Sequence, residues 1–314
     1  MKRKWIFAIF GIVMIIAIIS IVGKVNAKTI YVGPSERYTS IQDAVDNATD
    51  GDTIIVKDGI YCENIEVNKR LMIKSENGPD NCIIDGKKKD YVIAIGVDGV
   101  TIEGFTIKNA SSFEGKGIKI SSNYNNIRYN KISNNDEGIY FYLSSSKNNI
   151  TYNDISNNNY GIFLLSSSNN FIAYNNISNN EDGIWLAASN NNRIVYNYIS
   201  SNPDAAVYIG FSNSNRIVYN SISRNGDGIC IDSSLNNFIM KNNLIDNRRQ
   251  AYFFCSLRNH WWHNYWGWWR IPLPRPIFGV MGIVVSSDEL PIGIPIPGID
   301  FDWFPAIKPY NIGW

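Results

Sequence analysis

The stretch NNIRYNKISNNDEGIYFYLSSSKNNITYNDISNNNYGIFLL, residues 125–165, decides the fold. It is crowded with asparagine, which helix interiors and strands both disfavour, yet isoleucines recur between the asparagines at regular intervals. The pattern extends along the chain as a repeat of 21 to 23 residues. One column of the repeat consists of Gly117-Ile118, Gly138-Ile139, Gly161-Ile162, Gly183-Ile184, Ala206-Val207, Gly228-Ile229 and Ala251-Tyr252.

Each repeat contains three short apolar bursts separated by polar corners. None reaches the roughly 10–12 residues that a helix requires, and bursts of alternating character are typical of short strands. When such units stack, each strand pairs in parallel with its copy in the next coil, about 4.8 Å away, and the isoleucines share one core. The leucine-rich horseshoe, a competing solenoid, is disfavoured because its leucine signature is absent. The repeat therefore predicts an all-β, right-handed parallel β-helix with coils of roughly 22 residues.

A column of asparagines is interpreted as structural. Asparagine tolerates the left-handed backbone conformation that a sharp corner needs. An inward-pointing amide can also bond its copies above and below, which satisfies buried polar groups. We therefore expect a ladder inside the solenoid, rather than a ligand site, from Asn130, Asn153, Asn175, Asn197, Asn220 and Asn242, continued by Asn264.

Both ends of the chain differ from the repeat. Residues 1–27 begin with a basic triplet, followed by an apolar run from Trp5 to Gly23 and then small residues, which predicts an export signal or an uncleaved membrane anchor. Residues 28–266 are the predicted β-helix domain, opened by a short capping helix near residues 41–48. Residues 267–314 are rich in proline, glycine and tryptophan and are expected to form an irregular cap, because proline cannot continue a strand ladder.

Charge and cysteine content narrow the partners and the compartment. The formal net charge of +1 argues against nucleic acid, because phosphate binding requires a basic footprint. Either reading of the N-terminal segment places the domain outside the cytoplasm, with membrane contact only through that segment. Cys62 and Cys82 lie 20 residues apart, about one coil, so a disulfide between them is chemically permitted. Cys230 and Cys255 are out of register for a bridge.

Two segments carry a resemblance to known families. YTSIQDAVDNATDGDTIIVKDGIYCENIEVNKRLMIKS, residues 38–75, resembles the opening of many pectate-lyase-like β-helix proteins. The repeated Asn-x-Ile-x-x-Asn-x-x-Gly-Ile coils resemble those of the NosD-type family of exported repeat proteins. The resemblance covers most of residues 28–266 and implies the right-handed β-helix, a scaffold shared by lyases, hydrolases, epimerases, adhesins and surface proteins. It implies a role in copper-enzyme maturation only if metal ligands are present.

The candidate metal ligands are few. His260 and His263 stand three apart in the stretch HWWH, where extended chain would point them to opposite faces. With only Cys255 nearby, they make a poor site for a soft metal. We therefore predict no metal site there, and copper handling stays an alternative.

An aromatic column is predicted on the outside. Side chains alternate along a strand, so the residue after each inward isoleucine should point outward. An exposed aromatic stripe indicates a binding surface, and flat rings suit stacking on sugar faces, the ligands that the resemblance implies. Packing of the rings on one another is the alternative. The candidate ligand-binding residues are Tyr140, Phe163, Trp185, Tyr208 and Phe253, whereas a second column, Tyr129, Tyr152, Tyr174, Tyr196 and Tyr219, is interpreted as structural.

Acidic corners precede the aromatic column. Stacked carboxylates can bind calcium or act as acid and base across a glycosidic bond, and crowding shifts their proton affinities. Solvated turn residues are the alternative reading, since such turns accept aspartate freely. The catalytic candidates are Asp182, Asp204 and Asp227, and calcium is the one cofactor considered.

These observations predict an exported cell-envelope β-helix protein that binds a polysaccharide or glycan through its aromatic column. One alternative is a polysaccharide lyase or hydrolase that uses the acidic corners. The others are a structural or adhesive surface protein with a protein partner and a NosD-like copper-maturation factor.

Overall fold

The computed structural model describes residues 27–111, 113–285 and 292–313. The predicted export signal or anchor, residues 1–27, lies outside the described residues except for Ala27. Among the described residues, no helix is long and apolar enough to cross a bilayer.

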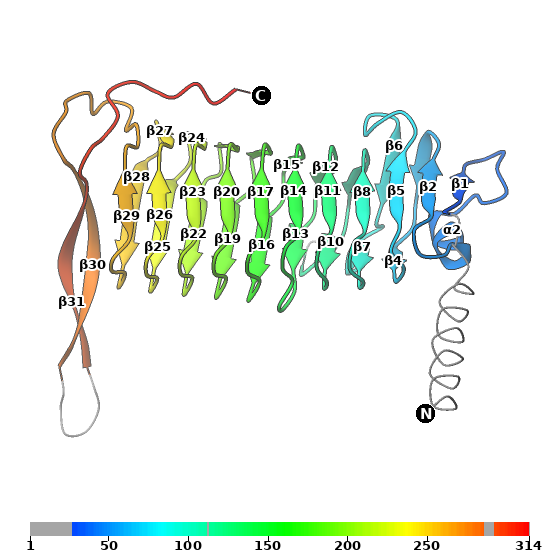
Figure 1. Cartoon of the computed structure of the whole chain (residues 1–314), viewed down its shortest axis with the longest axis horizontal. Coiled ribbons are helices and arrows are strands. Elements are labelled where there is room, and N and C mark those ends of the chain that lie inside the picture. Colours follow the sequence, from blue (N-terminus) through cyan, green and yellow to red (C-terminus); the bar gives the residue numbers. More distant parts are fainter. Residues whose placement is uncertain (1–26, 112, 286–291, 314) are drawn as a thin grey trace, which may run out of the picture.

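The chain winds into a solenoid of about 11 coils of roughly 23 residues, which confirms the predicted parallel β-helix (Figure 1). The first of its three parallel ladders consists of β4 (Ile65–Val67), β7 (Tyr91–Ile95), β10 (Lys116–Ile120), β13 (Glu137–Phe141), β16 (Tyr160–Leu165), β19 (Asp182–Ala187), β22 (Ala205–Gly210), β25 (Asp227–Asp232) and β28 (Arg249–Phe254). The second consists of β1 (Thr29–Val32), β2 (Thr53–Val56), β5 (Met72–Ser75), β8 (Thr101–Glu103), β11 (Asn126–Arg128), β14 (Asn149–Thr151), β17 (Phe171–Ala173), β20 (Arg193–Val195), β23 (Arg216–Val218), β26 (Phe238–Met240) and β29 (His260–Trp262). The third consists of β3 (Gly59–Tyr61), β6 (Cys82–Asp85), β9 (Thr106–Lys108), β12 (Lys131–Ser133), β15 (Asp154–Ser156), β18 (Asn176–Ser178), β21 (Tyr198–Ser200), β24 (Ser221–Ser223) and β27 (Asn243–Ile245).

The core is a stack of aliphatic side chains in register. Ile139 pairs with Ile162 and Ile162 with Ile184 across successive coils of the first ladder. All three are fully buried, as are the equivalent isoleucines of the other two ladders. Burying one such side chain contributes about 1.5–3 kcal/mol, and one shared core therefore holds the coils together.

The predicted asparagine column forms a continuous hydrogen-bonded ladder. The amide of Asn130 donates to Asn153 Oδ1 at 3.1 Å, and Asn153 donates to Asn175 Oδ1 at 3.0 Å. Each Oδ1 also accepts the backbone N–H of the asparagine in the preceding coil. Two further ladders run parallel to it, one from Asn135 to Asn247 and one from Asn125 to Asn259. The second of these was not predicted.

The backbone at the corners differs from the sequence prediction. The ladder asparagines do not adopt the left-handed conformation; the residue before each of them does, for example Tyr129 with φ of 58° and Tyr152 with φ of 56°. The asparagine amide instead satisfies corner carbonyls, as when Asn175 Nδ2 donates to Ile150 O and Ala173 O. The amide hydrogen bonds, not a tolerance of positive φ, therefore explain this column.

Replacing a mid-ladder asparagine should be costly. Asn197→Ala removes the acceptor of Asn175 N–H and the donor to the buried Ile172 O. Because each orphaned buried group costs about 1–3 kcal/mol, we expect the free energy of unfolding to fall by about 2–3 kcal/mol. Urea unfolding measures this, with Asn149→Ala, an exposed asparagine on β14, as the control. Equal loss of stability in both variants would contradict the ladder's role.

The two ends of the solenoid are covered differently (Figure 1). Helix α2 (Ile41–Asn47) begins at the N-cap Ser40 and buries Ile41, Ala44 and Val45 against the first coils. At the other end, β30 (Arg275–Val285) and β31 (Ile292–Asp302) form an antiparallel hairpin. The sequence predicted an irregular segment here, whereas the structure has a regular hairpin. Strand β30 pairs with β28 through only two residues, Gly279 and Val280, so its Pro276 lies outside the parallel ladder.

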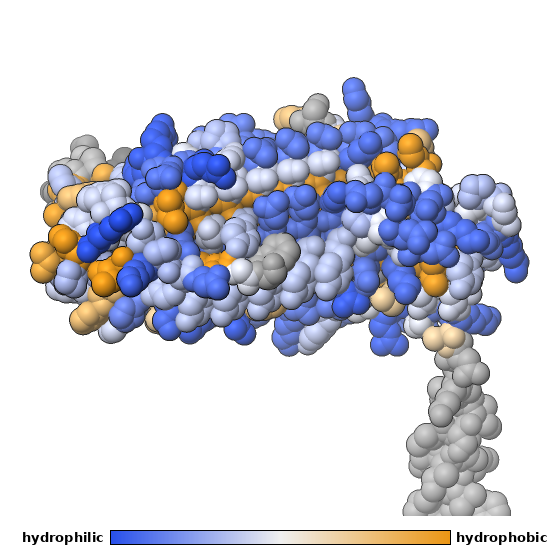
Figure 2. All heavy atoms as spheres, turned by 90° about the horizontal axis from the view of Figure 1, so that it is seen from above, coloured by the Kyte–Doolittle hydropathy of each residue, from blue (hydrophilic) through white to orange (hydrophobic). Residues whose placement is uncertain are grey.

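The C-terminal tail returns along the solenoid. Asn243 and the Tyr310 backbone exchange two hydrogen bonds of 2.9 Å, and the Tyr310 hydroxyl donates to His263 O at 2.8 Å. The face seen in Figure 2 is largely hydrophilic with a narrow apolar stripe along the axis, whereas hydrophobic residues gather at the C-terminal end. Trp268, Phe278 and Trp303 are exposed at that end.

The predicted disulfide between Cys62 and Cys82 is wrong, because all four cysteines are free. The strand register pairs Cys82 with Gly59, three residues before Cys62. Cys82 is fully buried in the core, where its thiol donates to Lys57 O at 3.6 Å, whereas Cys62 is exposed. One coil of separation therefore did not bring the two side chains to the same face.

Candidate functional site

The first ladder carries outward side chains in three columns, here called the outer face. In the strands from β10 to β25, a glycine or alanine stands between the first outward residue and the inward isoleucine or valine. A Cβ added to Gly183 would lie 2.5 Å from Ala206 O and 2.8 Å from the core residue Ile199, so this position faces the interior. On β19 the outward residues are consequently Asp182, Trp185 and Ala187.

The middle column of the outer face is the predicted aromatic column. Tyr140 lies 5.5 Å from Phe163, ring centre to ring centre, and Phe163 lies 6.5 Å from Trp185 in edge-to-face contact. Trp185 and Tyr208 stack at 4.0 Å with 25° between their planes. Tyr140 is buried, with Lys116 over its ring at 5.3 Å, so only the other three rings are half-exposed. The rings thus pack on one another and still present a surface.

The placement of Phe253 in this column is wrong. Strand β25 pairs Ile229 with Ala251 and Cys230 with Tyr252, so Tyr252 follows Cys230 in the column. Phe253 pairs with Ile231 and is 3% exposed in the core. Because the repeat varies by a residue from coil to coil, aligning Ala251-Tyr252 on the Gly-Ile pairs shifted this coil by one position and inverted its faces.

A hollow of about 210 Å³, here called the notch, brings the predicted residues together. Its lining includes Asp182, Asp204 and Asp227, the three catalytic candidates, with Trp185 and Tyr208 of the aromatic column. It exists because Ala205 occupies a position filled by Asp182 in the preceding coil and by Asp227 in the next. The other lining residues are Ala205, Cys230 and Arg248.

The ring of Tyr208 is held in place beside the notch. Its hydroxyl donates to Asp232 Oδ2 at 2.9 Å. A Cβ added to Gly210 would lie 2.8 Å from the Tyr208 ring, so only glycine lets the ring lie so close to the strand. With Trp185 stacked on it, Tyr208 is a preorganised flat surface.

The carboxylates of the notch have different environments. Burial, together with the nearby Asp204, raises the pKa of Asp182 to about 6, although the Ala205 N–H donates to it at 2.9 Å. Asp227 is instead paired with Arg249, whose Nε donates to Asp227 Oδ1 at 2.9 Å. Burial also raises the pKa of the Cys230 thiol to about 12, which makes it a poor nucleophile. Burial therefore brings the pKa of Asp182 toward neutral pH.

The raised pKa of Asp182 predicts a pH-dependent stability. A carboxyl with a higher pKa in the folded state stabilises the fold below its unfolded pKa, and that contribution is lost as pH rises through about 6. Asp182→Asn should therefore stabilise the protein at pH 7 by about 1–2 kcal/mol and much less at pH 4. Thermal unfolding of both proteins across this range measures the difference; a difference independent of pH would contradict the assignment.

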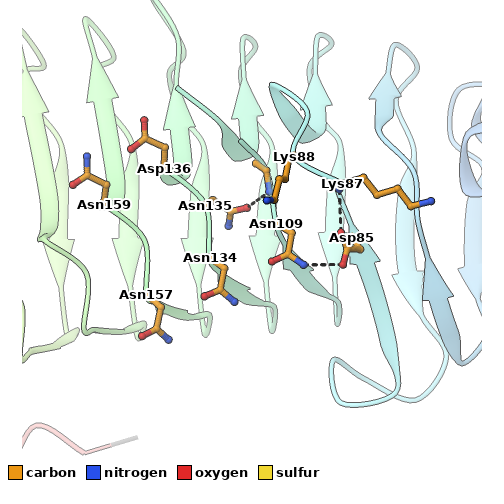
Figure 3. A pocket seen from close by; sticks show the side chains of 10 residues that line it. Asp85, Lys87, Lys88, Asn109, Asn134, Asn135, Asp136, Asn157 and Asn159 are labelled. Carbon is orange, nitrogen blue, oxygen red and sulfur yellow. Dashed lines mark hydrogen bonds between the residues drawn. The ribbon is translucent and has the colours of Figure 1, made fainter. Parts of the chain in front are cut away.

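A second hollow, the amide pocket, lies at the same edge of the first ladder, nearer the N-terminus (Figure 3). It has a volume of about 550 Å³. Asp136 and Asn159, which precede β13 and β16, lie on one side of it, and Asn109 donates to Asp85 at 2.7 Å on the other. Sequence reasoning did not predict this pocket, because its residues come from the corners of several coils and no pattern indicates that they surround a hollow.

The second predicted aromatic column, which follows the strands of the second ladder, consists of tyrosine rings stacked face to face. Successive rings from Tyr129 to Tyr219 lie 5.1 to 5.3 Å apart and within 13° of parallel. Lys241 lies over the last ring at 5.3 Å, and Tyr310 of the tail packs edge-on against it at 5.7 Å. Lys241 and Tyr310 therefore cover the last ring of the tyrosine column, Tyr219.

Residues 45–267 match the family model described as "Periplasmic copper-binding protein (NosD)". The chain belongs to this NosD family. A curated relative, the cell surface glycoprotein of Methanothermus fervidus, is 37% identical over 98 residues, which are 31% of this chain and 16% of that protein. The chain thus aligns with only a small part of that relative's length.

Solved structures with similar folds include proteins that act on polysaccharides. Pectate lyase Pel9A gives a TM-score of 0.55 at 15% identity, covering 74% of this chain and 76% of its own. The catalytic domain of a GH87 α-1,3-glucanase in complex with nigerose gives 0.57 at 14% identity, covering 76% and 55%. The Dettilon tailspike protein gives 0.59 at 15% identity, covering 74% and 55%. At these identities the similarity shows the fold alone.

The copper ligands implied by the NosD family name are not assembled in the part of the chain that is described. His260 stacks on Phe238 at 4.7 Å, whereas His263 contacts Trp262 and Phe304. Among the described residues, no group of three or more His, Cys, Asp or Glu side chains is placed to hold a metal ion. The donor set present therefore does not fit bound copper.

Proposed function

We propose that the protein is an exported cell-envelope β-helix protein that binds a polysaccharide on its outer face, with one sugar ring in the notch. The observation that carries this proposal is the stacked pair Trp185 and Tyr208 beside a hollow lined by carboxylates. The NosD family description, the surface-glycoprotein relative and the polysaccharide-active structural neighbours support it.

The chemistry of the notch suits a sugar. The flat apolar rings of Trp185 and Tyr208 can cover the C–H face of a pyranose, while the carboxylates accept hydrogen bonds from its hydroxyls. The volume of about 210 Å³ is smaller than the roughly 300 Å³ at which drug-sized pockets begin, so it suits about one ring. Coils about 4.8 Å apart then repeat the aromatic surface along the axis of a bound chain.

A glycan array and one filling substitution test this proposal. Ala205→Leu places a larger side chain on the floor of the notch and should weaken binding of the selected glycan at least about tenfold, or about 1.4 kcal/mol. Ala187→Leu, on the same face in β19 but outside the notch, is the matched control and should bind as the unchanged protein does. Equal affinity of all three proteins would contradict binding in the notch.

Hydrolysis of the bound polysaccharide is a second candidate, favoured by the pKa of Asp182. A carboxyl with a pKa of about 6 can hold a proton near neutral pH and donate it to a glycosidic oxygen. Asp204, which lines the same notch, is the corresponding base or nucleophile. Incubation with candidate polysaccharides should yield shortened products that Asp182→Asn no longer forms; intact polysaccharide would contradict catalysis and leave binding in place.

A further inference from the structure

The notch is bordered at its C-terminal side by a third hollow, here called the arginine pocket. Its volume is about 460 Å³, and it lies between β28 and the start of β30. Arg248 lines both hollows, so the two are adjacent along the solenoid axis. Among its other lining residues are Arg249, Tyr252, Trp268, Arg275 and Phe278.

Two of its three arginines lack a carboxylate partner among the described residues. Arg249 is paired with Asp227 and lies over the Tyr252 ring at 3.9 Å. Arg248 is exposed and forms no ion pair with any described residue. Asp246 also lines the pocket, but it too forms no ion pair within the described chain. The pocket therefore holds an excess of positive charge.

Arg275 is the most unusual of the three. Its guanidinium lies among three indoles, 5.6 Å from Trp266, 4.8 Å from Trp268 and 5.2 Å from Trp269. Nη1 donates to the backbone oxygen of Pro276 at 3.0 Å, while the buried Nε has no hydrogen-bond partner among the described residues. Burial lowers the pKa of Arg275. A half-buried cation with an unused donor is costly unless an anion completes it.

Beyond β10, which carries Lys116 and Lys119, the outer face is mainly acidic as far as β25. Glu137, Glu181, Asp182 and Asp204 all lie at or just before the strands from β13 to β22. A negatively charged group would be disfavoured along this acidic stretch and attracted at the arginine pocket beyond it. The sign of the charge thus changes where the notch meets the arginine pocket.

We propose, resting on the function proposed above, that the bound glycan is acidic and that Arg248 and Arg275 hold an anionic group of the sugar adjoining the notch. The planar guanidinium matches a carboxylate or sulfate with two parallel hydrogen bonds, a geometry that a hydroxyl cannot reproduce. Tyr252 and Trp268 supply ring surfaces in the same pocket. The polysaccharide consequently binds in one direction, with its charged sugar unit at the C-terminal end of the β-helix.

Isothermal titration with matched pairs of oligosaccharides tests this inference. One pair is an oligogalacturonate and its methyl ester; the other is a sulfated galactan oligosaccharide and its desulfated form. We expect the charged member of at least one pair to bind at least about tenfold more tightly, with the difference shrinking as salt rises. The pair that discriminates distinguishes a carboxylate from a sulfate.

Variants locate the effect. Arg248→Ala removes an exposed side chain that the fold does not need. It should bring the ratio of the affinities for the charged and the neutral oligosaccharide close to one. The control is Arg224→Ala, at an exposed position that follows a strand of the third ladder, and it should leave this ratio unchanged. Equal affinity within both pairs overturns the inference but leaves the proposed function standing. Binding of no member of either pair also overturns the inference, while the proposed function is decided separately by the glycan array and the Ala205→Leu variant.

Discussion

Replacing Asp302 by alanine is expected to lower the free energy of unfolding by about 4 kcal/mol and to free the C-terminal hairpin. Asp302 is fully buried at the point where the asparagine ladder ends. Its carboxylate accepts from Asn264 N at 2.8 Å, Asn264 Nδ2 at 3.2 Å, His263 N at 3.1 Å and Trp266 Nε1 at 3.0 Å. It occupies the place of the next ladder residue, so its loss leaves four donors without an acceptor.

Urea unfolding and limited proteolysis measure this effect. Asp302→Asn is the matched control, because the side-chain oxygen of an asparagine can accept the hydrogen bonds of the preceding asparagine, as Asn264 Oδ1 accepts from Asn242. We expect the asparagine variant to lose about 1 kcal/mol and to resist cleavage between residues 270 and 300, where the alanine variant is cut. Equal loss in both variants would show that the charge, and not the ladder geometry, secures the cap.

The second large effect is on binding. Trp185→Ala combined with Tyr208→Ala should abolish measurable affinity for the selected glycan, because two aromatic contacts of about 2 kcal/mol each are removed. The loss should exceed about 100-fold. Both side chains point outward and are half-exposed, so the coils should remain folded, which circular dichroism checks.

A control on the tyrosine ladder separates the two aromatic columns. Tyr174→Asn combined with Tyr196→Asn removes two stacked rings while keeping residues that tolerate their φ of 58° and 57°. This variant should bind the glycan as the unchanged protein does. If it lost binding while the Trp185 and Tyr208 variant retained it, the tyrosine ladder would be the binding surface.

The sequence allowed most of the fold to be predicted because the repeat is a strict physical constraint. The short helix predicted near residues 41–48 is α2. The predicted asparagine column begins at Asn130, whose Oδ1 accepts the Phe105 N–H. Identical side chains stacked at one coil spacing leave little freedom in register.

The errors arose where the period varies or where a contact is non-repetitive. Phe253 was assigned to the outside because one coil is a residue shorter than the alignment assumed, and a one-residue shift inverts both faces. Cys62 and Cys82 were paired on spacing alone, which does not fix side-chain direction. Asp302 could not be found, because it lies in a hairpin that carries no repeat, 38 residues after its partner Asn264.

The site was predicted in its parts but not as a hollow. Asp182, Asp204 and Trp185 were all selected from the sequence, yet the feature that joins them is a small residue, Ala205, in a column of larger ones. The only signal for it was an alanine aligned with Asp182 and Asp227. Arg248 and Arg275 were missed because they belong to the end of the solenoid and to the hairpin, where the repeat does not predict which residues lie together.

A crystal structure of the protein with the oligosaccharide that it binds most tightly tests the central claim most directly. We predict a pyranose ring in the notch, within about 4 Å of Trp185 and Tyr208, with one of its hydroxyls donating a hydrogen bond to the carboxylate of Asp182. Sugar density confined to the tyrosine ladder or the amide pocket, with Trp185 and Tyr208 uncovered, would contradict it.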